Sequence, residues 1–319
     1  MKVLIIQLRQ LGDILLTTPV IRAIKESMPD AQVDFMTYPM GRLIIPGNPL
    51  VRKHILAPQE GVLDALSFAR SLRNERYDVV FDFMATPRSA VIARLVPAFE
   101  RIAFSTSRSM LFTQTIPRGR ADDYIVREKF RLLKPIGINP SDVRMMLPLD
   151  DKDFVVPKNF FGSQEALLSS KLRVVLSPTH RRAERRWPLE RWAELAVWLE
   201  WSQNAQVIWI WGPGEEQEID AVMHLAQGAG IKSPRTTFRE LAALIKGSHL
   251  FIGNSNGPSH VAVAMDTPSI QLHGPTSAVS WCPMTDRHRA IQGSDMASIL
   301  VSDVKTLINL IGDTHHIEY

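Results

Sequence analysis

A carboxylate follows the first apolar run of the chain, in the segment QLRQLGDILLTTP. Gly12 and Asp13 stand where a predicted strand, residues 3–7, gives way to a predicted helix over residues 14–28. Open α/β sheets bind ligands at this edge, the carboxyl end of a central strand. Asp13 could cap the helix, which its position alone favours, or present an ionised carboxylate that accepts a proton from a bound hydroxyl. The two roles are compatible.

Arginines are concentrated in SPTHRRAERRWPLERW, after the predicted strand 173–178: Arg181, Arg182, Arg185 and Arg186. A helix opened by Pro188 follows them. A solvated loop would explain this composition. Guanidinium groups beside a helix start also make a good diphosphate clamp, because they offer fixed donors and a permanent charge. The position between two predicted strands favours the clamp.

The segment HLFIGNSNGPSHVAVAM takes an apolar strand, 249–254, into a helix that starts near Pro258. Gly253 and Gly257 permit close backbone approach, and amide groups at the helix start can bind an anion. A tight turn capped by Ser255 or Asn256 would explain the same residues. HGPT, residues 273–276, ends the next predicted strand at the same edge of the sheet, so both turns could border one ligand.

Two glutamates, Glu215 and Glu216, follow the predicted strand 206–212. At the first turn of a helix they are either partners of the helix dipole or carboxylates that meet ribose hydroxyls. The chain has no GxGxxG, HExxH, GxSxG or P-loop motif, so dehydrogenase, metalloprotease, serine hydrolase and P-loop kinase chemistry are poorly supported.

Short apolar runs alternate with helical periodicity, which predicts parallel sheets covered by helices. The expected strands are 3–7, 32–38, 54–57, 78–84 and 101–104, then 173–178, 206–212, 249–254 and 268–274; the expected later helices are 189–201, 215–227, 238–246 and 302–311. Turn residues from 139 to 162 indicate a linker. We therefore expect two doubly wound, Rossmann-like domains, residues 1–165 and 166–319, that face a central cleft, with the last helix able to cross back to the first domain.

The composition of the chain indicates the compartment and the kind of partner to expect. The N-terminus lacks the features of a signal peptide, no segment is apolar enough to span a bilayer, and Cys282 is the one cysteine, so we expect a cytoplasmic protein. The net charge is +4, which is compatible with an anionic lipid or membrane partner; no nucleic-acid module is recognisable. Leu43, Ile44 and Ile45 could face a membrane or form a buried edge.

Five stretches in this order resemble glycosyltransferase family 9, the heptosyltransferases of the lipopolysaccharide inner core: LGDILLTTP, FDFMATPRSA, RRWPLERWAEL, WGPGEE and GNSNGPSHVAVAMDTPSIQLHGPT. The resemblance spans nearly the whole chain. It implies a GT-B fold and an inverting transfer from an ADP-heptose donor, without metal or other cofactor. The implied acceptor is anionic, of the lipid A and core oligosaccharide type, and is reached by peripheral contact at the inner face of the inner membrane.

The resemblance also implies residue roles. Asp13 is the general base, and Arg185 stabilises the leaving diphosphate where the family commonly has lysine. Donor binding is expected from Thr179, Arg185, Arg186, Glu216, Ser255, Asn256, Gly257, Ser259 and His260. Acceptor binding is expected from Gly12, Arg88 and Ser89.

One departure affects the donor. The family usually has an aspartate where Ser255 stands, so another nucleotide sugar is an alternative to heptose. Two further alternatives are an inactive nucleotide-binding protein of the same fold and a nucleotide-sugar epimerase, which would need no acceptor.

Overall fold

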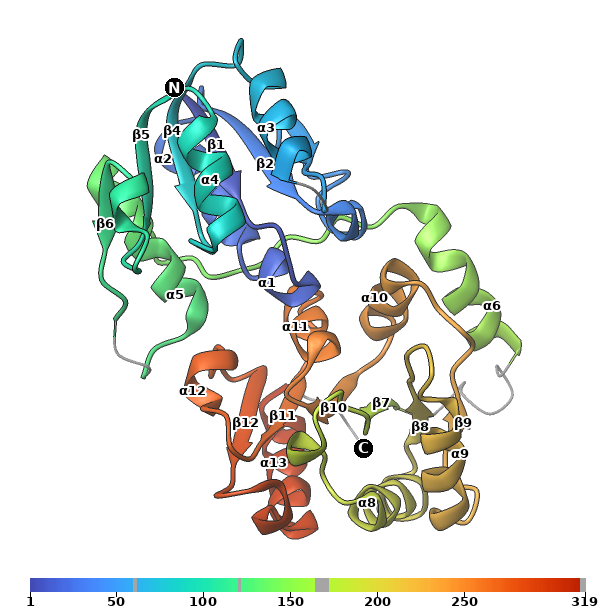
Figure 1. Ribbon diagram of the computed structural model, residues 1–319. Coiled ribbons are helices and arrows are strands. Elements are labelled where there is room, and N and C mark those ends of the chain that lie inside the picture. The colour runs from blue at the N-terminus through green and yellow to red at the C-terminus, as the bar shows by residue number, and fades with distance from the viewer. Residues whose placement is uncertain (60–61, 120–121, 164–171, 316–319) are drawn as a thin grey trace. The chain divides into compact units, whose positions relative to one another are not determined.

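The computed structural model describes residues 1–59, 62–119, 122–163 and 172–315 (Figure 1). Its contacts divide the chain into two compact units, Met1–Pro148 and Leu149–Tyr319. The expected boundary between residues 165 and 166 lies outside the described residues. The division comes earlier because α6 (Val155–Ser163) packs on α10 (Phe238–Lys246).

The first unit is built on a six-stranded sheet in the order β3-β2-β1-β4-β5-β6, with every strand pair parallel. Its strands are β1 (Lys2–Ile6), β2 (Gln32–Thr37), β3 (Lys53–Leu56), β4 (Tyr77–Asp82), β5 (Ala98–Phe104) and β6 (Gln114–Ile116). Its helices are α1 (Leu11–Leu15), α2 (Thr18–Ser27), α3 (Val62–Ser71), α4 (Pro87–Leu95) and α5 (Ile125–Phe130). A central parallel strand is covered on both faces and must be apolar throughout. β1 meets this condition, since its last four residues are fully buried.

The second unit repeats this topology in the order β12-β11-β10-β7-β8-β9, again with parallel pairs. Its strands are β7 (Arg173–Ser177), β8 (Gln206–Trp209), β9 (Ile231–Lys232), β10 (Leu250–Asn254), β11 (Ser269–His273) and β12 (His288–Gln292). Its remaining helices are α8 (Leu189–Ser202), α9 (Glu216–Leu225), α11 (Gly257–Ala264), α12 (Ala278–Trp281) and α13 (Val301–His315). The last helix, α13, packs on α8, β11 and β12 of its own unit. Both sheets have the strand order of doubly wound nucleotide-binding folds, which confirms the predicted fold class.

The helix expected over residues 14–28 is instead two helices, α1 and α2. Pro19 causes the break because it has no N–H to donate to the Leu15 carbonyl four residues earlier. The Thr18 hydroxyl donates to that carbonyl instead, at 2.7 Å. As a result Asp13 lies inside the short helix α1, and its N-cap is Gln10.

Of the residues considered for a membrane-facing patch, Ile44 and Ile45 are buried, at 0% and 1% exposed, whereas Leu43 is partly exposed. The buried explanation is therefore confirmed, and the membrane-facing one is wrong for these isoleucines. No helix within the described ranges has the length and apolar character needed to cross a bilayer.

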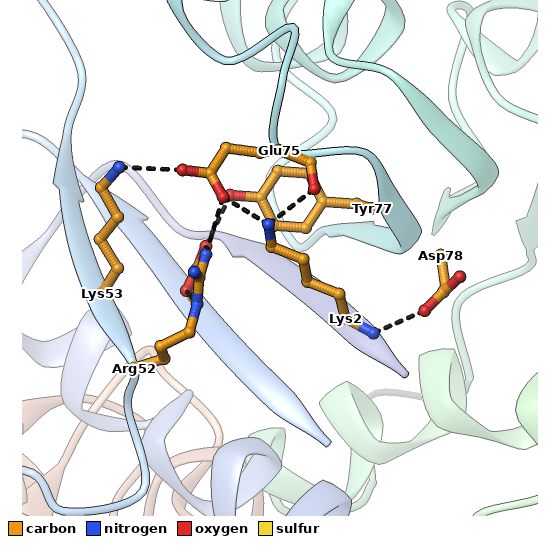
Figure 2. A network of polar contacts seen from close by, with 7 residues as sticks. Lys2, Arg52, Lys53, Glu75, Tyr77 and Asp78 are labelled. Carbon is orange, nitrogen blue, oxygen red and sulfur yellow. Dashed lines mark hydrogen bonds and ion pairs between the residues drawn. The ribbon is translucent and has the colours of Figure 1, made fainter. Parts of the chain in front are cut away.

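An ion-pair network ties the amino ends of four strands of the first unit together (Figure 2). Asp34, fully buried on β2, accepts hydrogen bonds from the Tyr77 hydroxyl at 2.7 Å and from Arg52 Nε at 2.8 Å. Glu75 accepts from Lys2, from Arg52 at 2.9 Å and from Lys53 at 3.1 Å. These cations lower the pKa of Glu75 to about 2. The network lies at the edge opposite the carboxyl ends of the strands, so its role is structural.

Replacing Tyr77 by Phe tests this network. The variant leaves the buried Asp34 short of one donor, and we expect the unfolding free energy of the first unit to fall by about 1–3 kcal/mol. Hydrogen exchange of amides in β1 and β2 measures the effect. Lys53→Ala removes an exposed member of the same network and should cost less than about 1 kcal/mol. Equal exchange rates in the two variants would show that Asp34 does not depend on Tyr77.

Candidate functional site

The Asp13 carboxylate lies on α1, directly after the carboxyl end of β1, and is half-buried. Its Oδ2 accepts a long hydrogen bond, 3.4 Å, from the backbone N–H of Gln10, which closes a capping box. The backbone carbonyl of Asp13 accepts from the Thr17 hydroxyl at 2.7 Å. The helix holds the Asp13 backbone firmly while the carboxylate keeps acceptor capacity for a ligand.

Lys129, on α5, is 5% exposed and lies beside the same strand end. Its Nζ donates to Gln7 Oε1 at 3.0 Å, and Gln7 Nε2 in turn donates to the Arg9 carbonyl at 2.6 Å. Burial lowers the pKa of Lys129 to about 8, against the opposing effect of the negative charge on Asp13. Lys129 and Asp13 are therefore close enough to interact electrostatically.

A cavity of about 390 Å³ opens over these groups, entirely within the first unit. It is lined by Gln7, Arg9, Gln10, Asp13, Phe83, Met84, Thr86, Phe104, Arg118, Ile125 and Lys129. The Arg118 guanidinium stacks on the Phe104 ring, 4.2 Å from its centroid. The rings of Phe83 and Phe104 and the cations Arg9, Arg118 and Lys129 thus surround one carboxylate, that of Asp13.

The loop after β4 forms one wall of this cavity and is folded by Asp82. The Asp82 Oδ1 accepts from the N–H groups of Met84, at 2.9 Å, and Ala85, at 3.0 Å. Burial raises the pKa of Asp82 to about 6. Ala85 has a positive φ of 48°, a conformation that costs a non-glycine residue of order 1 kcal/mol and is kept only where surrounding bonds enforce it.

Of the predicted acceptor residues, Arg88 and Ser89 occupy different environments. Arg88 is half-buried and donates to the Gln59 carbonyl at 2.8 Å. Ser89 is 0% exposed, and its hydroxyl accepts from the Thr86 N–H at 3.0 Å in the capping box of α4. The structure therefore gives Ser89 a helix-capping function, and its predicted role in acceptor binding stays a prediction.

In the second unit, two asparagines fasten the turn after β10 to the end of β7. Asn254, fully buried, donates to the Pro178 carbonyl at 2.6 Å. Asn256 donates from Nδ2 to the Ser177 hydroxyl and to the Thr179 carbonyl, both at 3.1 Å. The Asn256 Oδ1 accepts from the Ser259 N–H at 3.3 Å, so Asn256 is the N-cap of α11, one of the two caps that the sequence allowed.

The start of α11 opens to a ligand on one side. A Cβ added at Gly257 would meet no atom within 4 Å, whereas one at Gly253 would collide with the Phe251 ring at 2.8 Å. The Ser259 hydroxyl is buried and donates to the Asn254 carbonyl at 2.8 Å. The two glycines therefore serve different purposes: Gly253 allows tight packing and Gly257 leaves access to the helix start.

The loop after β8 is joined to the loop after β7 through Glu215. Its Oε2 accepts from the Thr179 hydroxyl at 2.6 Å and from the Gly212 N–H at 2.8 Å. Glu216, by contrast, is 55% exposed and pairs with Lys232 at 3.4 Å. Glu215 thus orders the loops, and the Glu216 carboxylate remains accessible to a ligand.

The arginine loop is anchored through His180 and Arg186. His180 Nε2 lies 3.1 Å from the Ser255 carbonyl oxygen, which links the loop to the turn after β10. Arg186 donates to the His180 carbonyl at 2.6 Å and pairs with Glu218 at 3.0 Å. Arg185 is half-buried, and burial together with the neighbouring Arg182 lowers its pKa. Arg185 is therefore the more enclosed cation of the two.

Two histidines complete this edge of the sheet. His273, at the end of β11, is fully buried; burial, with the charges of His260 and Arg185 as smaller causes, lowers its pKa to about 4. His260, on α11, is 7% exposed, and its ring lies tilted at 45° to the Trp281 ring with centroids 5.9 Å apart. His260 and Arg185 are therefore both near enough to His273 to disfavour its protonation.

Comparison with known proteins agrees with this architecture. The family model of glycosyltransferase family 9 (heptosyltransferase) matches residues 65–307. The chain belongs to glycosyltransferase family 9. It is therefore an enzyme that transfers a sugar.

Individual relatives in this family are distant but match over nearly their full length. Lipopolysaccharide heptosyltransferase 3 of Escherichia coli K12 is 29% identical over 298 residues, covering 88% of this chain and 84% of the relative. The family 9 glycosyltransferase of Veillonella parvula superposes with a TM-score of 0.87 at 18% identity, covering 98% and 97% of the two chains. E. coli ADP-heptose heptosyltransferase II gives 0.81 at 21% identity, covering 98% and 99%. The structural matches establish the two-domain GT-B fold.

Most residues predicted for this glycosyltransferase lie at the carboxyl edges of the two sheets. In the first unit these are Gly12, Asp13 and Arg88; in the second they are Thr179, Arg185, Arg186, Glu216, Ser255, Asn256, Gly257, Ser259 and His260. No group of three or more His, Cys, Asp or Glu side chains in the described part of the chain is arranged as a metal site. The roles of the named residues in catalysis and binding remain predictions.

The partnership of Gln7 and Lys129 was not predicted. The signal was present in IVREKF, where Lys129 falls three residues after Val126 and one before Phe130, both buried. Helical periodicity therefore places the lysine on the inward face. Glu215, His180 and Asn254 were also missed as loop anchors, because their partners are distant in sequence.

The low pKa of His273 makes the second unit sensitive to acid. The unfolded chain binds a proton at this histidine below about pH 6.5, whereas the folded chain does so only below about 4. Stability must therefore fall as the pH decreases through this window, by at most about 1.4 kcal/mol per pH unit from this group. His273→Gln should remove that part of the pH dependence.

The chain's tryptophans make the measurement specific, since all seven lie in the second unit: Trp187, Trp192, Trp198, Trp201, Trp209, Trp211 and Trp281. Urea unfolding followed by tryptophan fluorescence should show the stability advantage of wild type over His273→Gln shrinking toward low pH. Parallel pH profiles for the two proteins would contradict the buried neutral state of His273.

Proposed function

We propose that this glycosyltransferase transfers heptose from ADP-heptose to an anionic inner-core lipopolysaccharide acceptor, by one inverting displacement that needs no metal. The names of the relatives support the sugar and the acceptor. The position of Asp13 supports the mechanism most strongly, because this carboxylate lines a cavity bordered by cations. The proposal includes a cytoplasmic location with peripheral contact at the inner membrane.

In the proposed step, Asp13 accepts the proton of an acceptor hydroxyl while that oxygen attacks the anomeric carbon of the donor. The bond between the anomeric carbon and the β-phosphate oxygen breaks, and its electron pair leaves with ADP. A single displacement inverts the configuration of the anomeric carbon. Holding Asp13 at the third position of α1 keeps its backbone fixed during proton transfer.

The donor would be held by the second unit. Arg185 and Arg186 supply fixed positive charge for the diphosphate, which develops negative charge as the bond breaks. The open side of α11 at Gly257, with Ser259 and His260 behind it, provides a helix start for the same group. Glu216 is exposed and can accept from ribose hydroxyls, while Thr179 and Asn256 hold the surrounding loops.

Gly12 and Arg88 are the remaining acceptor candidates in the first unit. Gly12 carries no side chain beside Asp13, which allows a sugar to approach α1. The guanidinium of Arg88, on the helix that follows the cavity wall, suits a negatively charged acceptor. Ser89 supports this helix from inside through its capping box.

A different nucleotide sugar is the second candidate, because a serine occupies the position of the usual aspartate. Ser255 is 9% exposed, and its carbonyl is engaged by His180. A thermal-shift panel of ADP- and UDP-sugars tests the donor, since binding to the folded state raises apparent stability. A larger rise in Tm with ADP-heptose than with the other nucleotide sugars supports heptose as the transferred sugar. A larger rise with another nucleotide sugar would identify that sugar as the donor instead.

Asp13→Asn tests the proposed base. We expect acceptor-dependent ADP release to fall by about 10²- to 10⁴-fold, because general-base catalysis contributes on this scale. ADP binding should be unchanged, since the second unit carries the donor residues. The matched control is Asp30→Asn, an exposed carboxylate of the same unit, which should keep full activity. Turnover of Asp13→Asn at the wild-type rate would eliminate Asp13 as the base.

Arg185→Met tests the proposed diphosphate contact. Losing a charge-assisted hydrogen bond of about 1.5–3 kcal/mol should weaken ADP binding by about 10- to 100-fold. Arg185→Lys should recover part of the affinity, because it restores the charge without the planar fork. Arg235→Met, an exposed arginine of the same unit outside the arginine loop, is the control and should bind ADP normally. Binding can be followed by tryptophan fluorescence.

A further inference from the structure

Lys129 is a buried cation that forms no ion pair within 4.0 Å among the described residues, although the charge of Asp13 acts on it from further away. It is 5% exposed, its one direct hydrogen bond goes to the neutral Gln7 side chain at 3.0 Å, and no ion pair among the described residues includes it. The Phe83 ring lies 5.3 Å from its Nζ. Taking an ammonium group out of water without a directly bonded counter-charge costs several kcal/mol. Folding alone would favour an apolar side chain at this position.

The unused capacity of Lys129 is directed to the cavity. An ammonium group has three N–H donors, and Gln7 accepts one of them. Lys129 is among the residues that line the 390 Å³ cavity, together with Asp13. An oxygen-rich anion in this space would supply the missing acceptors and the missing negative charge together.

The charged residues that line the cavity favour binding of an anion near the cations and disfavour it near Asp13. Arg9, Arg118 and Lys129 are cations, and Asp13 is the one acidic residue among the lining side chains. A carboxylate or phosphate would be attracted by the three cations and repelled by Asp13. The acidic group would therefore bind toward Lys129, leaving a neighbouring neutral hydroxyl to face Asp13.

We propose that Lys129 recognises an oxyanion, carboxylate or phosphate, on the acceptor sugar and thereby positions the adjacent hydroxyl for Asp13. This role deepens the proposed function and rests on it for the identity of the reaction. Lys129 becomes a specificity-determining residue: it selects acceptors that carry negative charge beside the attacked hydroxyl. Gln7 keeps the ammonium pointed at the cavity when no ligand is bound.

Binding of small sugars to the full-length protein tests the proposal without turnover. The probes are glucuronate for the carboxylate, glucose 6-phosphate for the phosphate and glucose as the neutral match. Amide resonances of Gln7 and Asp13 report on the cavity. We expect at least one acidic sugar to shift them at concentrations where glucose does not, and the responding sugar identifies the type of oxyanion.

Three variants assign the effect to the side chain. Lys129→Met should weaken acidic-sugar binding at least tenfold and Lys129→Arg should restore part of it, whereas Lys134→Met, an exposed lysine nearby, should change nothing. The Met variant removes a buried charge, so it should fold with a Tm at or above that of wild type. A Met variant that binds acidic sugars as well as wild type would overturn the proposal, as would equal binding of glucose or no binding of any acidic sugar.

The outcome is separable from the proposed reaction. If acidic sugars bind through Lys129 but no ADP-sugar supports transfer, the anion site stands and the proposed function fails. If transfer occurs equally well with and without the oxyanion on the acceptor, and Lys129→Met is fully active, the proposed function stands and the anion site fails.

Discussion

Parallel pairing of the strands is the constraint on which the rest of this structure depends. In both units every strand pair of the described residues is parallel, so the chain leaves all strands at one edge of each sheet. The strand interiors are covered on both faces and must be apolar, as the fully buried residues of β1 and β10 show. The loops that follow the strands can therefore carry polar and charged side chains that the covered strand interiors largely exclude, although Asp34 on β2 is a buried exception. Chemistry at the carboxyl edge is a consequence of this topology.

The same constraint explains why the edge loops are so heavily bonded. A loop carrying cations and carboxylates has little apolar surface with which to fix its shape, so hydrogen bonds must do so. Asn256 joins two segments of the second unit, because it bonds to Ser177 and Thr179 at the end of β7 while it caps α11 at Ser259. In the first unit, Asp82 folds the loop after β4 although burial raises its pKa to about 6. These buried polar groups cost stability individually and are retained where they order the edge.

Much of the architecture could be predicted because apolar runs and turn residues are local signals. The central strands and the helices α8 and α10 lie within a residue or two of their predicted positions. The strands β6, β9 and β12 were missed because they are short or carry polar residues, such as Arg289 and Gln292 at the edge strand β12. The unit boundary was placed late because α6 belongs to the second unit through packing on α10, a contact between segments far apart in sequence.

The candidate site residues also differ in whether local sequence signals could predict their location and their partners. Asp13, Asn256 and Gly257 follow strands directly, so their location could be inferred from the strand pattern. The partners of Lys129 could not, since Gln7 is 122 positions away along the chain. Ser89 has the right chemistry for a ligand but is consumed by a helix cap, which only the backbone geometry reveals. Sequence indicates which loops carry the function; the structure identifies which side chains remain available to a ligand.

The central claim is that one displacement, with the Asp13 carboxylate as base, moves the sugar from its nucleotide to the acceptor. The most direct measurement is the anomeric configuration of the product formed from an ADP-heptose of known configuration, observed by proton NMR as the bond forms. A product of opposite configuration to the donor is the result predicted for a single displacement. A product that retains the donor configuration would contradict the mechanism, since it requires a different reaction path.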